Sequence, residues 1–239
     1  MFENAVPLDR SHSGAGGSLV QHAWCAAACL LNEKLICVDV TKTKALLHST
    51  TRLLKVDQAQ TAFEFFTKSE RISEDISLAL TQRDAFQMNI VLRQWVDIDI
   101  DMEFRGFVCN GRLNALSQYN HIVTFDRLRM DSEYQSDIQQ RILAFWDEEI
   151  KLRLAKVDIQ RCIVDFALTG RNRDRLFVIE LNPFQTSTDS ALFSWKTDRF
   201  ILENGPFEFC IRQDEDESLC SRLGVEWRDF VDKIQILAN

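Results

Sequence analysis

The chain has 239 residues, of which 46% are hydrophobic and 27% charged, an ordinary globular balance with enough length for one large domain or two modest lobes. Its formal net charge of −8 argues against a nucleic-acid-binding protein, because such domains usually display a basic stripe. Seven cysteines occur without a CxxC or Cys/His ligand spacing, which favours free thiols in the reducing cytoplasm over a zinc site.

The first 45 residues are expected to form a divergent, partly flexible N-terminal segment. Residues 1–18 contain a Gly/Ser-rich run and show no hydrophobic periodicity, as is typical of a flexible terminus. The apolar run 19–31 is too short to span a bilayer and begins too late for an ordinary signal peptide, so we predict a buried helix there. Residues 35–40 are predicted to form a strand. The main domain is then expected to occupy residues 46–239.

A helix is predicted after Asp57, because Asp57 and Gln60 resemble a capping box and an apolar stripe with helical spacing follows. The phenylalanines of this stripe, at positions 63, 65 and 66, are most simply interpreted as core residues. Residues 90–95, IVLRQW, are rich in β-forming residues and are predicted to form a short strand.

A β-hairpin is predicted from residues 102–108 and 113–118. The sequence Asn110-Gly111 lies between these two runs, and it favours a type I′ turn because both central residues of that turn need positive φ. Glu103 and Arg105 should share one face of the first strand. Arg105 could contact phosphate oxygens through its guanidinium fork, or could pair with Glu103 or another acid.

A long amphipathic helix is predicted from Ser132 to about Leu154, opened by a capping box at residues 132–135. We expect it to pack on the sheet, and it carries no visible chemistry. Residues 207–211 are predicted to form a last strand.

A second hairpin is predicted from residues 162–168 and 176–182, which flank a polar segment. Strand alternation would place Val178, Glu180 and Asn182 on one face. It would place Phe177, Ile179 and Leu181 on the other. If Leu168 pairs with Phe177, then Asp165 pairs with Glu180, and two carboxylates and the Asn182 amide oxygen meet on one face.

Carboxylates in the middle of apolar strands need a partner, because a buried charge must be paired or neutralised. Two adjacent carboxylates also repel each other unless a cation lies between them. Hard oxygen ligands of this kind suit Mg²⁺, which usually takes one or two carboxylates and leaves its other positions to water and phosphate. The alternative is that this face is exposed to solvent and the acids are the polar half of a half-buried sheet.

The same residues carry a family resemblance. The sequence VDF, then FVIELNPF and TDSALFSW, resembles the cell division cycle protein 123 family, which has an ATP-grasp-type fold and acts as an assembly chaperone for translation initiation factor 2. The matching positions are Asp165, Glu180, Asn182, Pro183, Phe184, Thr188, Asp189, Ser190, Leu192, Phe193 and Trp195. The resemblance extends upstream through VLRQW, EFRGFV and LSQ. The chain departs from the family pattern at Glu180-Leu181, where Asp-Phe is usual, and at Tyr119, where the family usually has Arg.

The resemblance implies an α+β, ATP-grasp-like fold with antiparallel sheets flanked by helices around a nucleotide cleft. It implies that Asp165, Glu180 and Asn182 bind Mg²⁺ and ATP and that Arg105 contacts phosphate. Residues 91–93 (Val91, Leu92 and Arg93) would contact the adenine edge through their backbone. The implied partner is the γ subunit of translation initiation factor 2, bound through Asp189, Phe193 and Trp195, by a monomer that contacts neither nucleic acid nor membrane.

Two alternatives remain open at this point. The chain could be a carboxylate–amine ligase on the same scaffold, or a divergent copy that has lost nucleotide binding. The second alternative arises because the family's Pro-Lys-Leu-Asn-Trp-Ser segment has no counterpart before Leu46. Lys42, Lys44 and Lys55 are the available substitutes for its lysine. No nucleophile–base pair is evident, so no catalytic residue is assigned.

Overall fold

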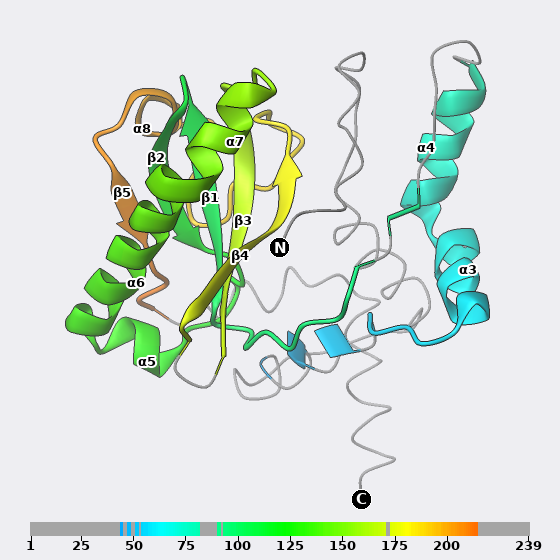
Figure 1. Cartoon of the computed structure of the whole chain (residues 1–239), viewed down its shortest axis with the longest axis horizontal. Coiled ribbons are helices and arrows are strands. Elements are labelled where there is room, and N and C mark those ends of the chain that lie inside the picture. The colour runs from blue at the N-terminus through cyan, green and yellow to red at the C-terminus, as the bar shows by residue number, and fades with distance from the viewer. Residues whose placement is uncertain are drawn as a thin grey trace, which may run out of the picture.

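The computed structural model describes residues 44, 47–48, 51–52, 54–81, 90–91, 93–170 and 173–214, and it is organised around a five-stranded sheet (Figure 1). The strands lie in the order β4-β3-β1-β2-β5. Their bounds are Glu103–Cys109 (β1), Arg112–Gln118 (β2), Cys162–Thr169 (β3), Arg175–Asn182 (β4) and Glu208–Cys210 (β5). The predicted α+β class is therefore confirmed.

The expectation of a purely antiparallel sheet is wrong at one edge. β1 pairs antiparallel with β2 and β3, and β3 with β4, but β5 runs parallel to β2. The parallel pairing arises because β5 does not follow β2 through a tight turn; the chain reaches it from β4 through a long connection that contains α8 (Arg199–Asn204).

The hairpin of β1 and β2 forms as predicted. Asn110 and Gly111 have φ values of 54° and 65°, the positive values that a type I′ turn requires. Gly106 of β1 lies on a crowded face, where an added Cβ would stand 2.7 Å from Phe166 Cε2 and 2.8 Å from Leu113 Cδ1. A side chain at position 106 would therefore have to displace a core aromatic ring.

The long helix also forms, as α6 (Ser132–Phe145), a π-helical turn η1 (Trp146–Ile150) and α7 (Lys151–Lys156). It begins at Ser132, although Asp131 caps it by accepting a hydrogen bond from the Tyr134 amide, so the capping box is displaced by one residue. The buried residues recur every four positions: Ile138, Ile142, Trp146, Ile150 and Leu154. An α-helix has 3.6 residues per turn, so a four-residue repeat drifts around its axis. The wider π turn corrects that drift and keeps the stripe on the sheet.

The sheet has two differently covered faces. The helix stripe packs on one face against a large apolar cluster that includes Phe104, Leu116, Val164 and Phe166, all fully buried. The opposite face carries a smaller cluster covered by α8 and by the chain after β4. Its members are Phe107, Ala115, Ile163, Phe193 and Leu202. Asp165 and Arg105 lie on this second face, because they alternate with the residues that face the helix.

The remaining helices are α3 (Ala59–Lys68), α4 (Glu70–Thr81) and the short α5 (Asp126–Arg129). The predicted core role of the α3 phenylalanines is wrong, because no residue of α3 is buried and Phe63 is 57% exposed. Residue Gln58, not Asp57, precedes this helix, and its side chain makes no capping bond. The predicted strand at residues 90–95 does not form in its described part, where Ile90 and Val91 are more than half exposed.

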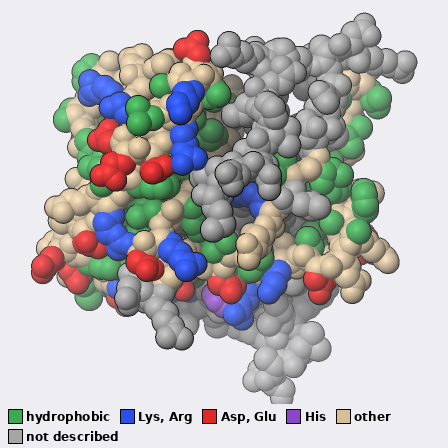
Figure 2. All heavy atoms as spheres, viewed as in Figure 1, with side chains coloured by type: hydrophobic (Ala, Val, Ile, Leu, Met, Phe, Trp, Pro, Cys, Tyr) green, Lys and Arg blue, Asp and Glu red, His purple; other side chains and the backbone are tan. Residues whose placement is uncertain are grey.

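Several predictions fall outside the described residues. They concern the flexible terminus 1–18, the helix at 19–31, the strand at 35–40, and Leu92 and Lys42. No helix in the described part of the chain is long and apolar enough to cross a membrane. On the face shown in Figure 2, basic and acidic side chains are intermixed where α6 and α7 lie. Ion pairs between η1 and α7 include Lys151–Asp147 and Arg153–Glu149.

Candidate functional site

The predicted pairing of Asp165 with Glu180 is confirmed, although the register that was expected to produce it is not. Leu168 pairs with Leu176 rather than with Phe177, and a β-bulge next to Asp165 then shifts the register by one residue. Ile179 is the extra residue, since Phe166 pairs with Val178 and Asp165 with Glu180. The bulge thus brings the two carboxylates opposite each other.

The same bulge corrects the predicted faces of β4. Val178 packs against the helix-side cluster together with Leu176 and Leu181, although it was expected to share a face with Glu180. The inserted residue interrupts the alternation of side chains between the two faces of the strand. Residues before and after the bulge therefore do not follow one continuous alternating pattern. Glu180 and Asn182 consequently lie on the second face, beside Asp165.

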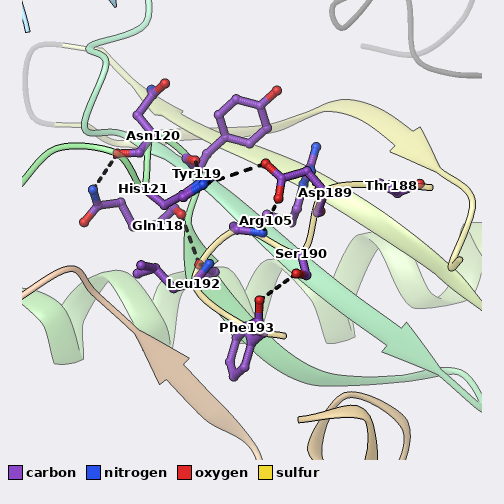
Figure 3. Close-up of polar contacts among 12 residues, drawn as sticks. Arg105, Gln118, Tyr119, Asn120, His121, Thr188, Asp189, Ser190, Leu192 and Phe193 are labelled. Carbon is purple, nitrogen blue, oxygen red and sulfur yellow. Dashed lines mark hydrogen bonds and ion pairs between the residues drawn. The ribbon is translucent and has the colours of Figure 1, made fainter. Parts of the chain in front are cut away.

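Arg105 makes a fully buried, bidentate ion pair with Asp165. The guanidinium Nε and Nη2 donate to Asp165 Oδ1 and Oδ2, both at 2.8 Å, and the side chains are 2% and 1% exposed. The third nitrogen, Nη1, donates to the backbone carbonyl of Asp189 at 2.7 Å (Figure 3). Of the two roles weighed for Arg105, pairing with an acid is therefore the one that its contacts show.

Asn182 connects the two acids. Its Nδ2 donates to Asp165 Oδ2 at 3.0 Å and to Glu180 Oε1 at 2.9 Å. Glu180 Oε2 and Asn182 Oδ1 are buried and have no hydrogen-bond partner. Buried acceptors are normally satisfied, so these two oxygens leave room for a cation or for a proton on Glu180, which also hydrogen-bonds to Asp165.

These oxygens suit a hard cation such as Mg²⁺, which binds proteins through one or two carboxylates and keeps several waters. Within the described residues, no group of three or more His, Cys, Asp or Glu side chains is placed to hold a metal ion. A metal here would therefore rely on Glu180, the Asn182 amide oxygen and Asp165, with its remaining positions filled from outside the protein.

Burial governs the charge of this site. Burial, and then the charge of Asp165, raise the pKa of Glu180 to about 8, although the bond from Asn182 lowers it. The pKa of Glu103 is raised to about 8, chiefly by burial and by Asp165. Burial alone would lower the pKa of Arg105, but its bonds to Asp165 raise it above the ordinary value, so it stays cationic. The site thus holds one permanent cation, Arg105, beside two carboxyl groups, Glu103 and Glu180, whose raised pKa values favour the protonated form.

Residues 183–195 form a loop over this face, which we call the aromatic loop. Phe184, Phe193 and Trp195 pack edge-on against Phe107, with ring centroids 6.4, 5.5 and 6.0 Å from it. Trp195 Nε1 donates to the carbonyl of Thr188 at 2.7 Å, and the Leu192 amide donates to Ser117 Oγ of β2 at 3.1 Å. The loop is therefore attached to the sheet at several points.

The segment after Asp189 forms turns and no helix before Arg199. Asp189 Oδ1 accepts a hydrogen bond from the Ala191 amide, as in an Asx turn, but Ala191 has a φ of 53°, which a right-handed helix does not allow. The next helix is α8, which begins at Arg199. Of the three residues assigned to partner binding, Phe193 is buried, Trp195 is half-buried and the Asp189 side chain is 54% exposed.

Tyr119 and His121 border the site, and neither was predicted to belong to it. The Arg105 guanidinium carbon lies 4.8 Å from the centroid of the Tyr119 ring, and His121 Nε2 lies 3.9 Å from Asp189 Oδ2 (Figure 3). Burial, together with the charge of Asp165, raises the pKa of Tyr119 well above its ordinary value. The sequence did contain one signal: Tyr119 stands where the family usually has Arg, which indicates that this side of the site differs from the family pattern.

The other expected site residues do not join this cluster. Val91 and Arg93 are exposed and lie outside any helix or strand, and no contact among the described residues links them to Asp165. The Lys44 ammonium lies 5.5 Å from the centroid of the Phe125 ring, and Lys55 is exposed. The structure thus brings together Arg105, Asp165, Glu180, Asn182 and the Asp189 backbone.

Comparison with known proteins gives a consistent result. The family model described as D123 matches residues 32–219. A translation initiation factor eIF2 assembly protein of Lodderomyces elongisporus is 28% identical over 163 residues, which cover 66% of this chain and 39% of that protein. The protein of the same name in Xenopus laevis is 29% identical over 107 residues, or 45% of this chain and 29% of that one. The chain therefore spans well under half the length of these curated relatives.

Two further matches are more distant. A putative CDC123-like protein of Acanthamoeba polyphaga mimivirus is 26% identical over 163 residues, which cover 62% of this chain and 45% of the viral protein. Among solved structures, that of Cdc123 from Schizosaccharomyces pombe aligns with a TM-score of 0.46 at 20% identity, covering 78% of this chain and 85% of the other.

Proposed function

Because the chain belongs to the D123 family, we propose that it takes part in the assembly of translation initiation factor eIF2 and that it binds ATP with Mg²⁺ on the sheet face that carries Asp165. The family match supports the assembly role, and relatives from this family are named as eIF2 assembly proteins. The partner we propose is the γ subunit, as the family resemblance implies. The protein would act in the cytoplasm.

The observation that best supports the metal site is the pair of orphaned oxygens, Glu180 Oε2 and Asn182 Oδ1, beside the charged Asp165. Mg²⁺ bound there would supply the positive charge that bridges the acids to nucleotide phosphates. Asn182 would hold the acids at a fixed spacing, and burial would exclude bulk water from them. Arg105 would add a positive charge beside the acids and so limit their repulsion of a polyanion.

A copy that has lost nucleotide binding is the alternative that one observation favours. All three guanidinium nitrogen atoms of Arg105 donate to protein acceptors, so the arginine would meet phosphate only by giving up a bond. A charge-assisted contact between an arginine and phosphate is worth on the order of 1.5–3 kcal/mol, or roughly tenfold or more in affinity. Because Arg105 does not offer this contact freely, we expect ATP binding to be weak and to depend strictly on Mg²⁺.

Isothermal titration of ATP, with Mg²⁺ and then with EDTA, tests the nucleotide part of this proposal. Glu180→Gln replaces a carboxyl group, which a bound cation would hold deprotonated, with an amide, and it does not leave Arg105 unpaired. It should weaken Mg-ATP binding at least about tenfold. Glu149→Gln is the matched control, because Glu149 is half-exposed on the helix layer and pairs only with Arg153 in the contacts described. Tight binding in EDTA, or equal affinities for the two variants, would refute the metal site. No binding to the wild type would favour the alternative.

A pull-down of purified eIF2 γ subunit tests the partner part. Asp189→Ala removes an exposed carboxylate of the aromatic loop and should lower the amount of γ subunit retained. Asp147→Ala, an exposed acid on the helix layer, should have no effect. Equal retention by both variants would count against the aromatic loop as the docking element.

A further inference from the structure

Arg105 is the only described side chain that hydrogen-bonds both to the buried acids and to the aromatic loop. Two of its nitrogens hold Asp165, and the third donates to the carbonyl of Asp189 at 2.7 Å. The side chain is 2% exposed, so none of these bonds is shared with bulk water. Its orientation is therefore set by its acceptors within the protein.

The carbonyl of Asp189 lies at the centre of the aromatic loop. The preceding residue, Thr188, accepts the indole hydrogen bond of Trp195, and the following turn is closed by the bond from the Phe193 amide to the Ser190 carbonyl at 3.1 Å. Ser190 Oγ also donates to the Phe193 carbonyl, as Figure 3 shows. A change in the bond at Asp189 therefore reaches both halves of the loop through short, direct contacts.

The Arg105 guanidinium can donate its hydrogen bond to the aromatic loop only while Asp165 holds the guanidinium in place. A bidentate carboxylate fixes the guanidinium plane, and the direction of Nη1 follows from that plane. A cation that took the Asp165 oxygens, or a substitution that removed their charge, would free the guanidinium to rotate and would weaken its bond to Asp189. Coupling of this kind is reciprocal, so a partner that moved the loop would in turn alter Asp165.

We propose that Arg105 is a positioning residue that holds Asp165 and the Asp189 carbonyl at the same time, so that the bonding state of Asp165 sets the order of the aromatic loop. The role of this linkage in eIF2 assembly rests on the proposed function, in which Asp165 binds the metal and the aromatic loop binds the partner. The physical linkage itself needs neither ligand and is testable in the chain alone.

The test is two-dimensional ¹H–¹⁵N NMR with amide hydrogen exchange on the full chain, read at the Trp195 indole and at the Leu192 and Phe193 amides. Trp195→Phe identifies the indole signal among the five tryptophans. In Asp165→Asn, the loop signals should shift and their exchange should accelerate at least about tenfold relative to β3 amides. The β3 amides act as an internal reference, because global destabilisation would accelerate both sets together.

Two further variants keep the result decisive. Arg105→Lys retains a counter-ion for Asp165 but lacks the planar fork, so the loop should be released although the acid stays paired. Glu149→Gln alters a half-exposed acid on the helix layer, away from Asp165, and it should leave the loop signals in place. Unchanged loop exchange in Asp165→Asn or Arg105→Lys would overturn the proposal, as would an equal acceleration in Glu149→Gln. Because these outcomes need no metal or nucleotide, failure of Mg-ATP binding would refute the proposed function and not this linkage.

Discussion

The buried ion pair of Arg105 and Asp165 allows a quantitative test of what holds the second face of the sheet together. Leucine in place of Asp165 would leave a guanidinium that is 2% exposed with no carboxylate partner, holding only the hydrogen bond to the Asp189 carbonyl and the contact with the Tyr119 ring. Removing one member of such a pair typically costs about 3–5 kcal/mol of unfolding free energy, because a charge remains buried without compensation. We expect Asp165→Leu and Arg105→Met each to lose that amount.

The double variant, Arg105→Met with Asp165→Leu, should be far less destabilised than the sum of the two. It buries no unpaired charge, and its remaining losses are the donor to Asp189 and the acceptor for Asn182, about 1–3 kcal/mol in total. The coupling free energy between the two positions should therefore be about 3 kcal/mol or more.

Urea unfolding at pH 7, followed by circular dichroism, measures the four free energies of this cycle. The pair of Lys151 and Asp147 provides the control, because its side chains are 48% and 63% exposed, and its coupling should be within about 0.5 kcal/mol of zero. A double variant destabilised by the full sum of the single variants would show that the pair at Arg105 and Asp165 is not the buried, directly coupled unit described above.

Two further predictions concern the rest of the sheet. Gly106→Ala should lower the free energy of unfolding by about 1–3 kcal/mol, because the new methyl group would meet the Phe166 ring at 2.7 Å, and an unchanged urea midpoint would contradict that crowding. The pKa of Glu180 is raised to about 8, chiefly by burial, so between pH 4.5 and 8 the native state holds a proton that the unfolded chain has lost. Stability should therefore fall as the pH rises through this range, and Glu180→Gln should reduce the slope. Parallel pH profiles for the wild type and Glu180→Gln, from urea unfolding, would rule this out.

Local features of the structure followed directly from the amino-acid sequence. The Asn110-Gly111 turn formed where both residues could adopt positive φ, and the four-residue spacing of apolar side chains marked the long helix. The pairing of Asp165 with Glu180 was also within reach of the sequence, since both lie in adjacent strands of one hairpin. Turn chemistry and side-chain periodicity act over a few residues, and a sequence displays them completely.

The state of the candidate site was decided by the tertiary structure. Nothing in the sequence of β4 indicated the bulge at Ile179. The bulge places Val178 on the face opposite to the predicted one and sets Glu180 opposite Asp165. Arg105 lies 60 residues from Asp165 and 84 from Asp189 along the chain, so its commitment to both became visible only when the strands and the aromatic loop packed together. A buried guanidinium must find acceptors for its donors wherever the fold brings them, and strand alternation cannot say which acceptors those are.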